Sequence, residues 1–399
     1  MGPTDVQDKN LVEIERLLPG GFGLAHAEGL TLFVALAAPG DILRVKIERK
    51  RGSVGFASIV EVVKPSTVRV EPPCPYFGLC GGCDFQQLDY EAQLVAKVEI
   101  IRDCLHRIGR LETPPDIVMV PSPAQWQYRS RANWQFDPKT KRLGYFARGS
   151  HDVCDVEVCA VLRPELQQTL ERLREQMRAG TLSKKLTDIE AVVGDDDVSL
   201  ASATTHFRSK EVSRRIARET YYFGAEAFFQ INHELLELLL GETVGEEQGK
   251  TAIDLYSGVG LFTLPLARRF DRVTAVESNS RAVDYAQRNL DAAELDNVEV
   301  ANMSVAEWLK HWLGFERPEF LLLDPPRTGA ESGVIEGILS VAPQKICYVS
   351  CDPATLARDL NKLLEGGYSL DSIVGFDMFP QTHHVETVTR LTHSEFSQL

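Results

Sequence analysis

The chain has 399 residues, 44% hydrophobic and 25% charged, which is enough for roughly two or three domains with substantial cores. Its formal net charge of −14 excludes a protein coated uniformly in nucleic acid, because phosphate binding requires local positive charge. The sequence has no apolar run long enough to cross a membrane and no N-terminal secretion signal, so we expect a cytoplasmic protein without a membrane partner.

Positive charge is concentrated in two segments. Residues 41–70 hold seven basic side chains against three acidic ones, and residues 125–150 hold six against one. Because the distribution of charge matters more than its total, these segments are candidates for contact with a nucleic-acid backbone. The candidate phosphate-binding side chains are Arg49, Lys50, Arg51, Arg129 and Arg131.

The first third of the chain changes character twice. Residues 11–66 contain short apolar stretches separated by glycine turns, a pattern typical of a small β-barrel. After a break rich in proline, glycine and cysteine, residues 90–109 show apolar side chains at spacings of three and four, which predicts a helix. Residues 120–222 mix both patterns, and periodicity alone assigns them no fold.

From about residue 223 strand-like and helical segments alternate. The first two strand-like segments are 251–256 and 272–278, and helical segments follow each at 261–270 and 281–295. Such alternation predicts a parallel sheet with helices on both faces. We therefore divide the chain into 1–66, 67–222 and 223–399, with the segment around 90–120 a candidate to pack against the third domain.

A candidate nucleotide site lies at the ends of these predicted strands. The sequence Asp254-Leu-Tyr-Ser-Gly258-Val-Gly260 follows the first strand, and its glycines allow a tight turn against a ligand. Thr263 stands where a dinucleotide-binding loop would have glycine or alanine, which favours an adenosyl ligand over NAD. Glu277 ends the second strand, where a carboxylate can accept hydrogen bonds from ribose hydroxyls.

Two side chains near the C-terminus are candidates for chemistry. Cys351 follows the apolar strand 345–349 and precedes a helix, a position that can favour a reactive thiolate, whereas Cys347 fits a buried structural role. Glu386 lies on a strand-like terminal segment and suits a proton acceptor. On pattern alone, the alternating polarity there favours a Glu386 that simply faces water.

A group of cysteines precedes the predicted helix. Cys74, Cys80 and Cys83 form a compact set framed by glycines, and Cys154 or Cys159 can supply a fourth thiol. Four thiolates suit either zinc or an iron–sulfur cluster, and spacing does not distinguish the two.

Residues 128–148 interleave basic and aromatic side chains. Arginines there can hold phosphates while aromatic rings stack on unpaired bases. A half-buried strand with solvated charges explains the same alternation equally well.

Taken together, these motifs resemble the RNA uracil-5-methyltransferases, above all the branch that methylates 23S rRNA and carries an iron–sulfur cluster. The resemblance runs nearly end to end. It includes the segments Phe228-Phe229-Gln230-Ile231-Asn232, Asp324-Pro-Pro-Arg327, Ser350-Cys351-Asp352-Pro353 and Met378 to Glu386.

The resemblance implies a fold and a set of site residues. It implies a Rossmann-like class I α/β methyltransferase domain, an N-terminal OB-type TRAM barrel and an α+β central iron–sulfur domain. Cys351 becomes the nucleophile and Glu386 the general base, in place of the water-facing side chain that the pattern favoured. The implied ligands of S-adenosylmethionine are Gln230, Tyr256, Gly258, Gly260, Glu277 and Asp324. The implied ligands of a [4Fe-4S] cluster are Cys74, Cys80, Cys83 and Cys159, which selects Cys159 over Cys154.

The resemblance also implies the reaction. Addition of a thiolate to carbon 6 of uracil activates carbon 5 toward the methyl group of S-adenosylmethionine, and a base then removes the carbon-5 proton. The expected partner is RNA, preferably 23S rRNA, and we expect a monomer. Two alternatives remain open: the same chemistry on tRNA, and an RNA-binding or ribosome-assembly factor without catalysis.

Overall fold

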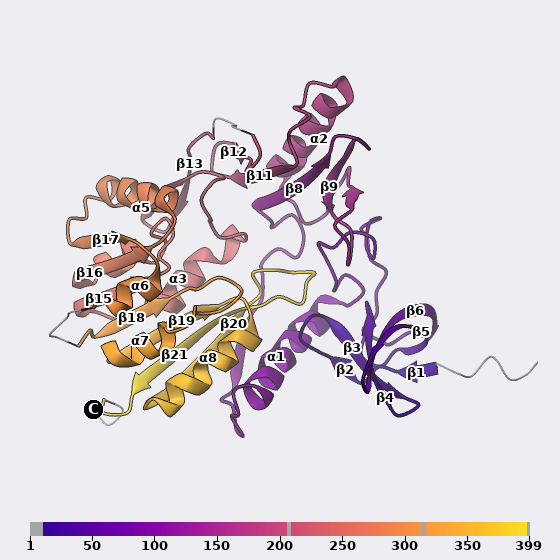
Figure 1. Cartoon of the computed structure of the whole chain (residues 1–399), viewed down its shortest axis with the longest axis horizontal. Helices are drawn as coiled ribbons and strands as arrows, with labels where there is room; N and C mark the ends of the chain where they lie inside the picture. The colour runs from indigo at the N-terminus through magenta and orange to yellow at the C-terminus, as the bar shows by residue number, and fades with distance from the viewer. Residues whose placement is uncertain (1–10, 206–208, 313–316, 397–399) are drawn as a thin grey trace, which may run out of the picture.

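The computed structural model describes residues 11–205, 209–312 and 317–396, and Figure 1 shows three parts along the chain. A small β-domain is followed by a central part, and a large sheet layered with helices contains most of the C-terminal half. The first ten residues of the predicted 1–66 domain lie outside the described residues. In the described part of the chain, no helix has the length and apolar character that crossing a membrane requires.

The N-terminal sheet has six strands in the order β1-β5-β6-β4-β3-β2. They are β1 (Leu11–Glu13), β2 (Arg16–Leu17), β3 (Phe22–Ala27), β4 (Leu30–Ala35), β5 (Ile42–Arg51) and β6 (Val54–Lys64). The edge strands β1 and β2 are consecutive in the chain, so the two edges of the sheet lie close together and the sheet curls around its own core. Val12, Leu32, Val34 and Leu43 belong to that core. The region predicted as β-structure is therefore a β-sheet, in which β1 to β4 are short, as expected, whereas β5 and β6 have 10 and 11 residues.

The large sheet has eight strands in the order β17-β16-β15-β18-β19-β21-β20-β7. They are β7 (Ile117–Val120), β15 (Gly249–Leu255), β16 (Phe270–Glu277), β17 (Val298–Asn302), β18 (Phe320–Leu323), β19 (Lys345–Ser350), β20 (Tyr368–Phe376) and β21 (Glu386–His393). The expectation of a purely parallel sheet was wrong in one place. β21 runs antiparallel between β19 and β20, because it returns directly from β20 as a hairpin partner.

Helices cover both faces of this sheet, as the alternating pattern predicted. They are α1 (Tyr90–Arg107), α3 (Leu236–Val244), α4 (Thr263–Ala267), α5 (Ser280–Ala292), α6 (Val305–Lys310), α7 (Val334–Val341) and α8 (Pro353–Glu365), and the short 3-10 helix η1 (His233–Leu235) precedes α3. Successive strand residues point to opposite faces. Tyr348 packs with α1, α6, α7 and α8 on one face, while its neighbours Cys347 and Val349 pack with α3, α4 and α5 on the other. The predicted helix at 90–109 thus packs against the large sheet, and strand β7 is its edge strand beside β20.

The central part is an antiparallel sheet with one covering helix (Figure 1). Its strands are β8 (Arg131–Asp137), β9 (Arg142–Phe146), β10 (Val153–Asp155), β11 (Asp188–Val193) and β12 (Val198–Ala201), and α2 (Pro164–Ala179) packs on it. The hairpin β13 (Val212–Ile216) and β14 (Glu219–Phe223) follows. Tyr221 and Phe223 belong to the core of the large sheet, so the boundary predicted at residue 222 falls inside β14.

Candidate active site

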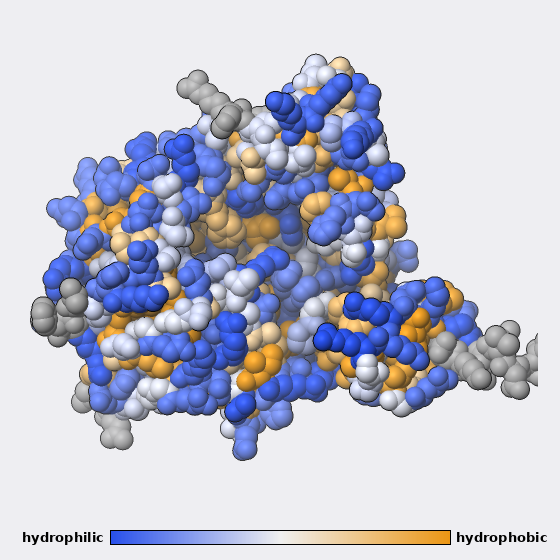
Figure 2. All heavy atoms as spheres, viewed as in Figure 1, coloured by the Kyte–Doolittle hydropathy of each residue, from blue (hydrophilic) through white to orange (hydrophobic). Residues whose placement is uncertain are grey.

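A cleft of about 1600 Å³ opens at the carboxyl ends of β15, β16, β18 and β19. Ligands of open α/β sheets bind at this edge, because the loops after the strands converge there. Figure 2 shows the surface hollowed between the large sheet and the central part. Among the residues that line the cleft are seven of the eight predicted catalytic and cofactor residues: Gln230, Tyr256, Gly258, Glu277, Asp324, Cys351 and Glu386.

The predicted contact residue Gly260 is the exception. It is not part of the lining; its amide donates to the carbonyl of Ser257 at 2.9 Å, and its φ of +89° requires glycine. A Cβ at this position would stand 3.2 Å from the side chain of Leu264. Gly260 therefore shapes the turn from behind, and the prediction that it contacts the ligand directly is not favoured.

The turn after β15 is tied to the end of β16 by a carboxylate. The Gly258 amide donates to Glu277 Oε2 at 3.0 Å, and the Asn279 amide donates to Oε1 at 2.7 Å. Tyr256 and Gly258 both have positive φ values, 64° and 56°. Glu277 thereby holds the strained turn in place and presents a half-buried carboxylate to the cleft.

Asp254 was named only as the start of a motif, and the structure gives it a specific partner. Its Oδ2 accepts a hydrogen bond from Thr263 Oγ1 at 2.5 Å, while Oδ1 has no hydrogen-bond partner within the described ranges. Burial raises the pKa of Asp254 to about 7. Thr263 stands where a dinucleotide-binding loop would have glycine or alanine. Its hydroxyl, which those residues lack, makes this hydrogen bond to Asp254.

Cys351 and Glu386 are brought together by the antiparallel register of β19 and β21. Ser350 pairs with Thr387, and the Thr387 hydroxyl donates to the Ser350 carbonyl at 2.9 Å, so the next residues outward are Cys351 and Glu386. Glu386 is 2% exposed, which contradicts the water-facing side chain that alternating polarity favoured. It is buried because β21 is an interior strand.

The electrostatics of this group favour protonated forms when no cation is bound. Burial raises the pKa of Glu386 well above its usual range, and the nearby Asp324 raises it further. Burial, helped by the charge of Asp254, raises the pKa of Asp324 to about 7. Burial and the carboxylates of Glu386 and Asp324 also raise the pKa of the Cys351 thiol, while Arg327 acts in the opposite direction. An ionised carboxylate buried here without a positive partner is costly in free energy. A cationic ligand bound in this cleft would supply that positive partner.

The loop before η1 carries Gln230 into the cleft, and Arg131 holds that loop. The Arg131 guanidinium donates to the carbonyls of Ala227 at 2.7 Å and Ala225 at 2.9 Å, and pairs with Glu190. Its donors are thus committed to protein groups, which argues against the predicted phosphate contact. Gln230 Nε2 lies 3.5 Å from Asp324 Oδ2.

A second pocket, of about 470 Å³, is lined by all four predicted cluster cysteines: Cys74, Cys80, Cys83 and Cys159. Cys154, on β10, is not in the lining. Arg129 also lines this pocket, beside the thiols. This position argues against the predicted contact of Arg129 with RNA. No three His, Cys, Asp or Glu side chains of the described residues are arranged to hold a single metal ion.

The basic residues of the small β-domain are accessible. Arg49, Lys50 and Arg51 are exposed at the end of β5, and the Arg49 guanidinium lies 4.4 Å from the centre of the Phe56 ring. Their contact with RNA stays a prediction.

Phe228 and Arg327 are two of the cleft residues to which the sequence assigned no role. Phe228 lines the cleft and is 61% exposed, and Arg327 also lines it, where its positive charge lowers the pKa of both Cys351 and Glu386. Both lie inside motifs that were recognised, and an aromatic residue two positions before the predicted ligand Gln230 was the available signal for Phe228.

Comparison with known proteins gives consistent results. A family model described as tRNA (Uracil-5-)-methyltransferase matches residues 204–394. The chain is 30% identical to an uncharacterized RNA methyltransferase of Aquifex aeolicus, covering 97% of this chain and 99% of the relative. It is 31% identical to the 23S rRNA (uracil(1939)-C(5))-methyltransferase RlmD of Pectobacterium atrosepticum, covering 97% and 95%.

Among solved structures, the chain is similar to a Pyrococcus abyssi tRNA (uracil-54, C5)-methyltransferase in complex with S-adenosyl-L-homocysteine. The two superpose with a TM-score of 0.74 at 25% identity, covering 96% of this chain and 100% of the other.

Proposed function

We propose a substrate and a mechanism on the premise that this chain belongs to the S-adenosylmethionine-dependent RNA uracil-5-methyltransferases. It transfers a methyl group to carbon 5 of a uridine in 23S rRNA through a covalent bond between Cys351 and carbon 6. The observation that carries the mechanism is the pairing of Cys351 with the buried carboxylate of Glu386 across β19 and β21, inside the cleft.

The cleft residues fit S-adenosylmethionine, which supplies an activated methyl group on a positively charged sulfur. Glu277 can accept hydrogen bonds from ribose hydroxyls, and the turn at Tyr256 and Gly258 presents backbone to the adenosine. Asp324, whose pKa is raised to about 7 by burial, gains a compensating charge when the cation binds. Gln230 lies beside Asp324 and is placed to contact the cofactor or the flipped base.

Carbon 5 of uracil becomes nucleophilic only after an addition. The Cys351 thiolate adds to carbon 6, and the resulting enolate places negative charge at carbon 5. Carbon 5 then takes the methyl group and the bond from sulfur to methyl breaks. Glu386 removes the carbon-5 proton, and the electron pair of that bond expels Cys351 as a thiolate. Arg327 lines the cleft with both groups, and its charge favours their anionic forms.

The choice of 23S rRNA rests on the relatives of named function. Two of them, at 31% and 29% identity, carry 23S rRNA in their names, whereas the similar solved structure is a tRNA enzyme. The target uridine must leave its stack to reach Cys351, which favours a loop or an unpaired site. The exposed Arg49, Lys50 and Arg51 of the TRAM-like β-domain are the proposed phosphate contacts.

Mapping of new 5-methyluridine tests the substrate. Anaerobically purified protein is incubated with S-adenosylmethionine and RNA from cells lacking such modification, and isolated 23S rRNA and tRNA are analysed by mass spectrometry. We expect methylation in 23S rRNA alone, at one or a few positions. Methylation of tRNA alone would overturn the substrate, and no 5-methyluridine in either pool would favour a binding factor without catalysis.

We also propose that the cysteine pocket holds a [4Fe-4S] cluster. The support is that four thiols from two separate segments of the chain line one cavity, and four thiolates are the usual ligand set of such a cluster. Arg129 in the same pocket can offset the negative charge of four thiolates. No step of the reaction moves an electron, so the proposed role is structural, in shaping the central part that faces RNA.

Iron content distinguishes Cys159 from Cys154. Cys159→Ser should lower bound iron and sulfide well below the roughly four irons per chain of a full cluster. Cys154→Ser is the matched control, and we expect its iron content to equal that of the unaltered protein. Equal iron content in both variants would contradict Cys159 as a ligand.

A further inference from the structure

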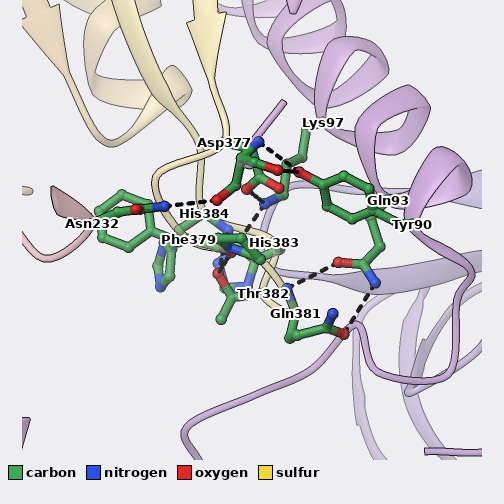
Figure 3. A network of polar contacts seen from close by, with 12 residues as sticks. Tyr90, Gln93, Lys97, Asn232, Asp377, Phe379, Gln381, Thr382, His383 and His384 are labelled. Carbon is green, nitrogen blue, oxygen red and sulfur yellow. Dashed lines mark hydrogen bonds and ion pairs between the residues drawn. The ribbon is translucent and has the colours of Figure 1, made fainter. Parts of the chain in front are cut away.

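The loop that leads into Glu386 is held by residues from outside its own hairpin. It spans residues 377–385 between β20 and β21 (Figure 3). Gln93 of α1 exchanges two hydrogen bonds with Gln381: its Nε2 donates to Gln381 Oε1 at 3.1 Å, and its Oε1 accepts from the Gln381 amide at 2.9 Å. Lys97 pairs with Asp377 at 2.5 Å, and both side chains are fully buried. One side of the loop is thus fastened to α1.

The other side of the loop is fastened to the cysteine segment, at the residue that follows Cys83. Asp84 Oδ1 accepts from the His383 amide at 2.8 Å, and Oδ2 lies 2.5 Å from His383 Nδ1. The amides of Asp84 and Phe85 both donate to the Gln381 carbonyl, at 3.1 and 3.0 Å. Asp84 therefore holds both the backbone and the ring of a residue three positions before Glu386.

From His383 the contacts continue into the cleft. The rings of His383 and His384 lie 4.1 Å apart, and Arg327 Nη1 lies 3.4 Å from His384 Nε2. Burial and the neighbouring cations lower the pKa of His384 to about 3, so the ring is neutral and its free nitrogen can accept from Arg327. Arg327 in turn lines the cleft with Cys351 and Glu386, and its charge favours their anionic forms. The contacts thus run from Asp84 through His383 and His384 to Arg327, which lines the cleft together with the two reacting side chains.

We propose that Asp84 is a positioning residue for the general base: it holds the loop so that Glu386 can reach the carbon-5 proton of the methylated adduct. The inference rests on the function proposed above. Proton removal requires the acceptor within hydrogen-bond reach, and a displacement of about 1 Å can lower a rate by about 10²-fold. Addition of Cys351 and methyl transfer come earlier and depend mainly on the placement of Cys351 after β19, a strand to which no hydrogen bond of Asp84 leads within the described residues. Loss of Asp84 therefore slows proton removal by Glu386 more than it slows the earlier steps.

This selectivity gives a readout that general destabilisation would not produce. In Asp84→Ala, carbon 6 of the uracil remains bonded to Cys351 after methyl transfer, because removal of the carbon-5 proton is slow. We expect a fall in kcat of about 10-fold or more, a nearly unchanged KM for S-adenosylmethionine, and a build-up of protein–RNA complex that survives denaturing electrophoresis. Asp84→Asn keeps an acceptor for the His383 amide, and should show the same build-up to a smaller extent.

Two further variants make the test decisive. Glu386→Gln, which removes the base itself, must trap the complex. Asp41→Ala is the matched control: Asp41 is a buried carboxylate that pairs with Arg69 in the N-terminal domain, so its loss should lower stability without trapping RNA. Trapping by Glu386→Gln but by neither Asp84 variant would overturn the positioning role alone. Absence of trapping in Glu386→Gln would overturn the covalent mechanism and this inference with it. Should Asp84→Ala not fold, Asp84→Asn decides the outcome.

Discussion

Replacing Cys351 with alanine should lower the rate of RNA methylation by about 10⁴-fold or more. Without the thiolate addition, carbon 5 of uracil has no charge with which to attack the methyl group, so the variant loses the chemical step rather than one contact. The side chain lines the cleft just after β19, while the adenosyl contacts are proposed at β15 and β16. Affinity for S-adenosylhomocysteine, measured by calorimetry, should therefore change by less than about threefold.

Cys347 supplies the matched control for this prediction. It lies on β19, four residues before Cys351, and is fully buried in the core of the sheet. Cys347→Ala should lower thermal stability because it leaves a small cavity, but it should retain most of the methylation rate in folded protein. Activity of Cys351→Ala within about 100-fold of the unaltered enzyme would contradict the nucleophilic role.

Replacing Glu386 with glutamine should have the second largest effect, a fall in turnover of about 10²- to 10⁴-fold with accumulation of the covalent complex. Glutamine has nearly the same shape but accepts no proton, so the methylated adduct forms and is not resolved. Burial and Asp324 raise the pKa of Glu386, which means that the carboxylate is costly to ionise there. The neutral amide removes that cost, so the variant should fold at least as stably.

The complex formed by Glu386→Gln is measured by denaturing electrophoresis with labelled RNA. A double variant, Glu386→Gln with Cys351→Ala, should trap none, because it lacks the bond-forming sulfur. Release of methylated RNA by Glu386→Gln at the rate of the unaltered enzyme would show that another group removes the proton.

The alternation of strands and helices after residue 223 predicted the layers of the large sheet and the edge where the site lies. What it did not predict was the reversal of β21, and that reversal is what pairs Cys351 with Glu386. Parallel and antiparallel neighbours give the same apolar pattern on an interior strand, since both faces are covered in either case. The burial of Glu386 was missed for the same reason.

The arginines at 129 and 131 show a different limit. Interleaved cations and aromatics in 128–136 predicted a strand, and β8 is one. The sequence did not indicate what each cation would meet. Arg131 donates to the carbonyls of Ala225 and Ala227, nearly a hundred residues away, and Arg129 faces cysteines contributed by two separate segments. Partners this distant follow from tertiary packing, which local patterns do not encode.

The sequence predicted the residues of the cysteine pocket better than it predicted the partners of these arginines. Cysteine is a rare residue, so several cysteines close together in a sequence are a specific signal. Cys74, Cys80 and Cys83 share one short loop, whereas Cys159 follows β10 by only four residues. The nearby Cys154 had equal standing on spacing alone. Its place on β10, outside the pocket lining, separates the two.

The account is tested most directly by identifying the bond in the complex trapped by Glu386→Gln. The variant is incubated with RNA and S-adenosylmethionine, digested with nuclease and protease, and analysed by mass spectrometry. We predict one modified peptide, with Cys351 bonded to carbon 6 of a uridine that already carries the transferred methyl group. Two results would contradict the account. A complex joined through another residue would exclude Cys351 as the nucleophile. A nucleotide bound to Cys351 without the methyl group would show that Glu386 is needed before methyl transfer, against the proposed order of steps.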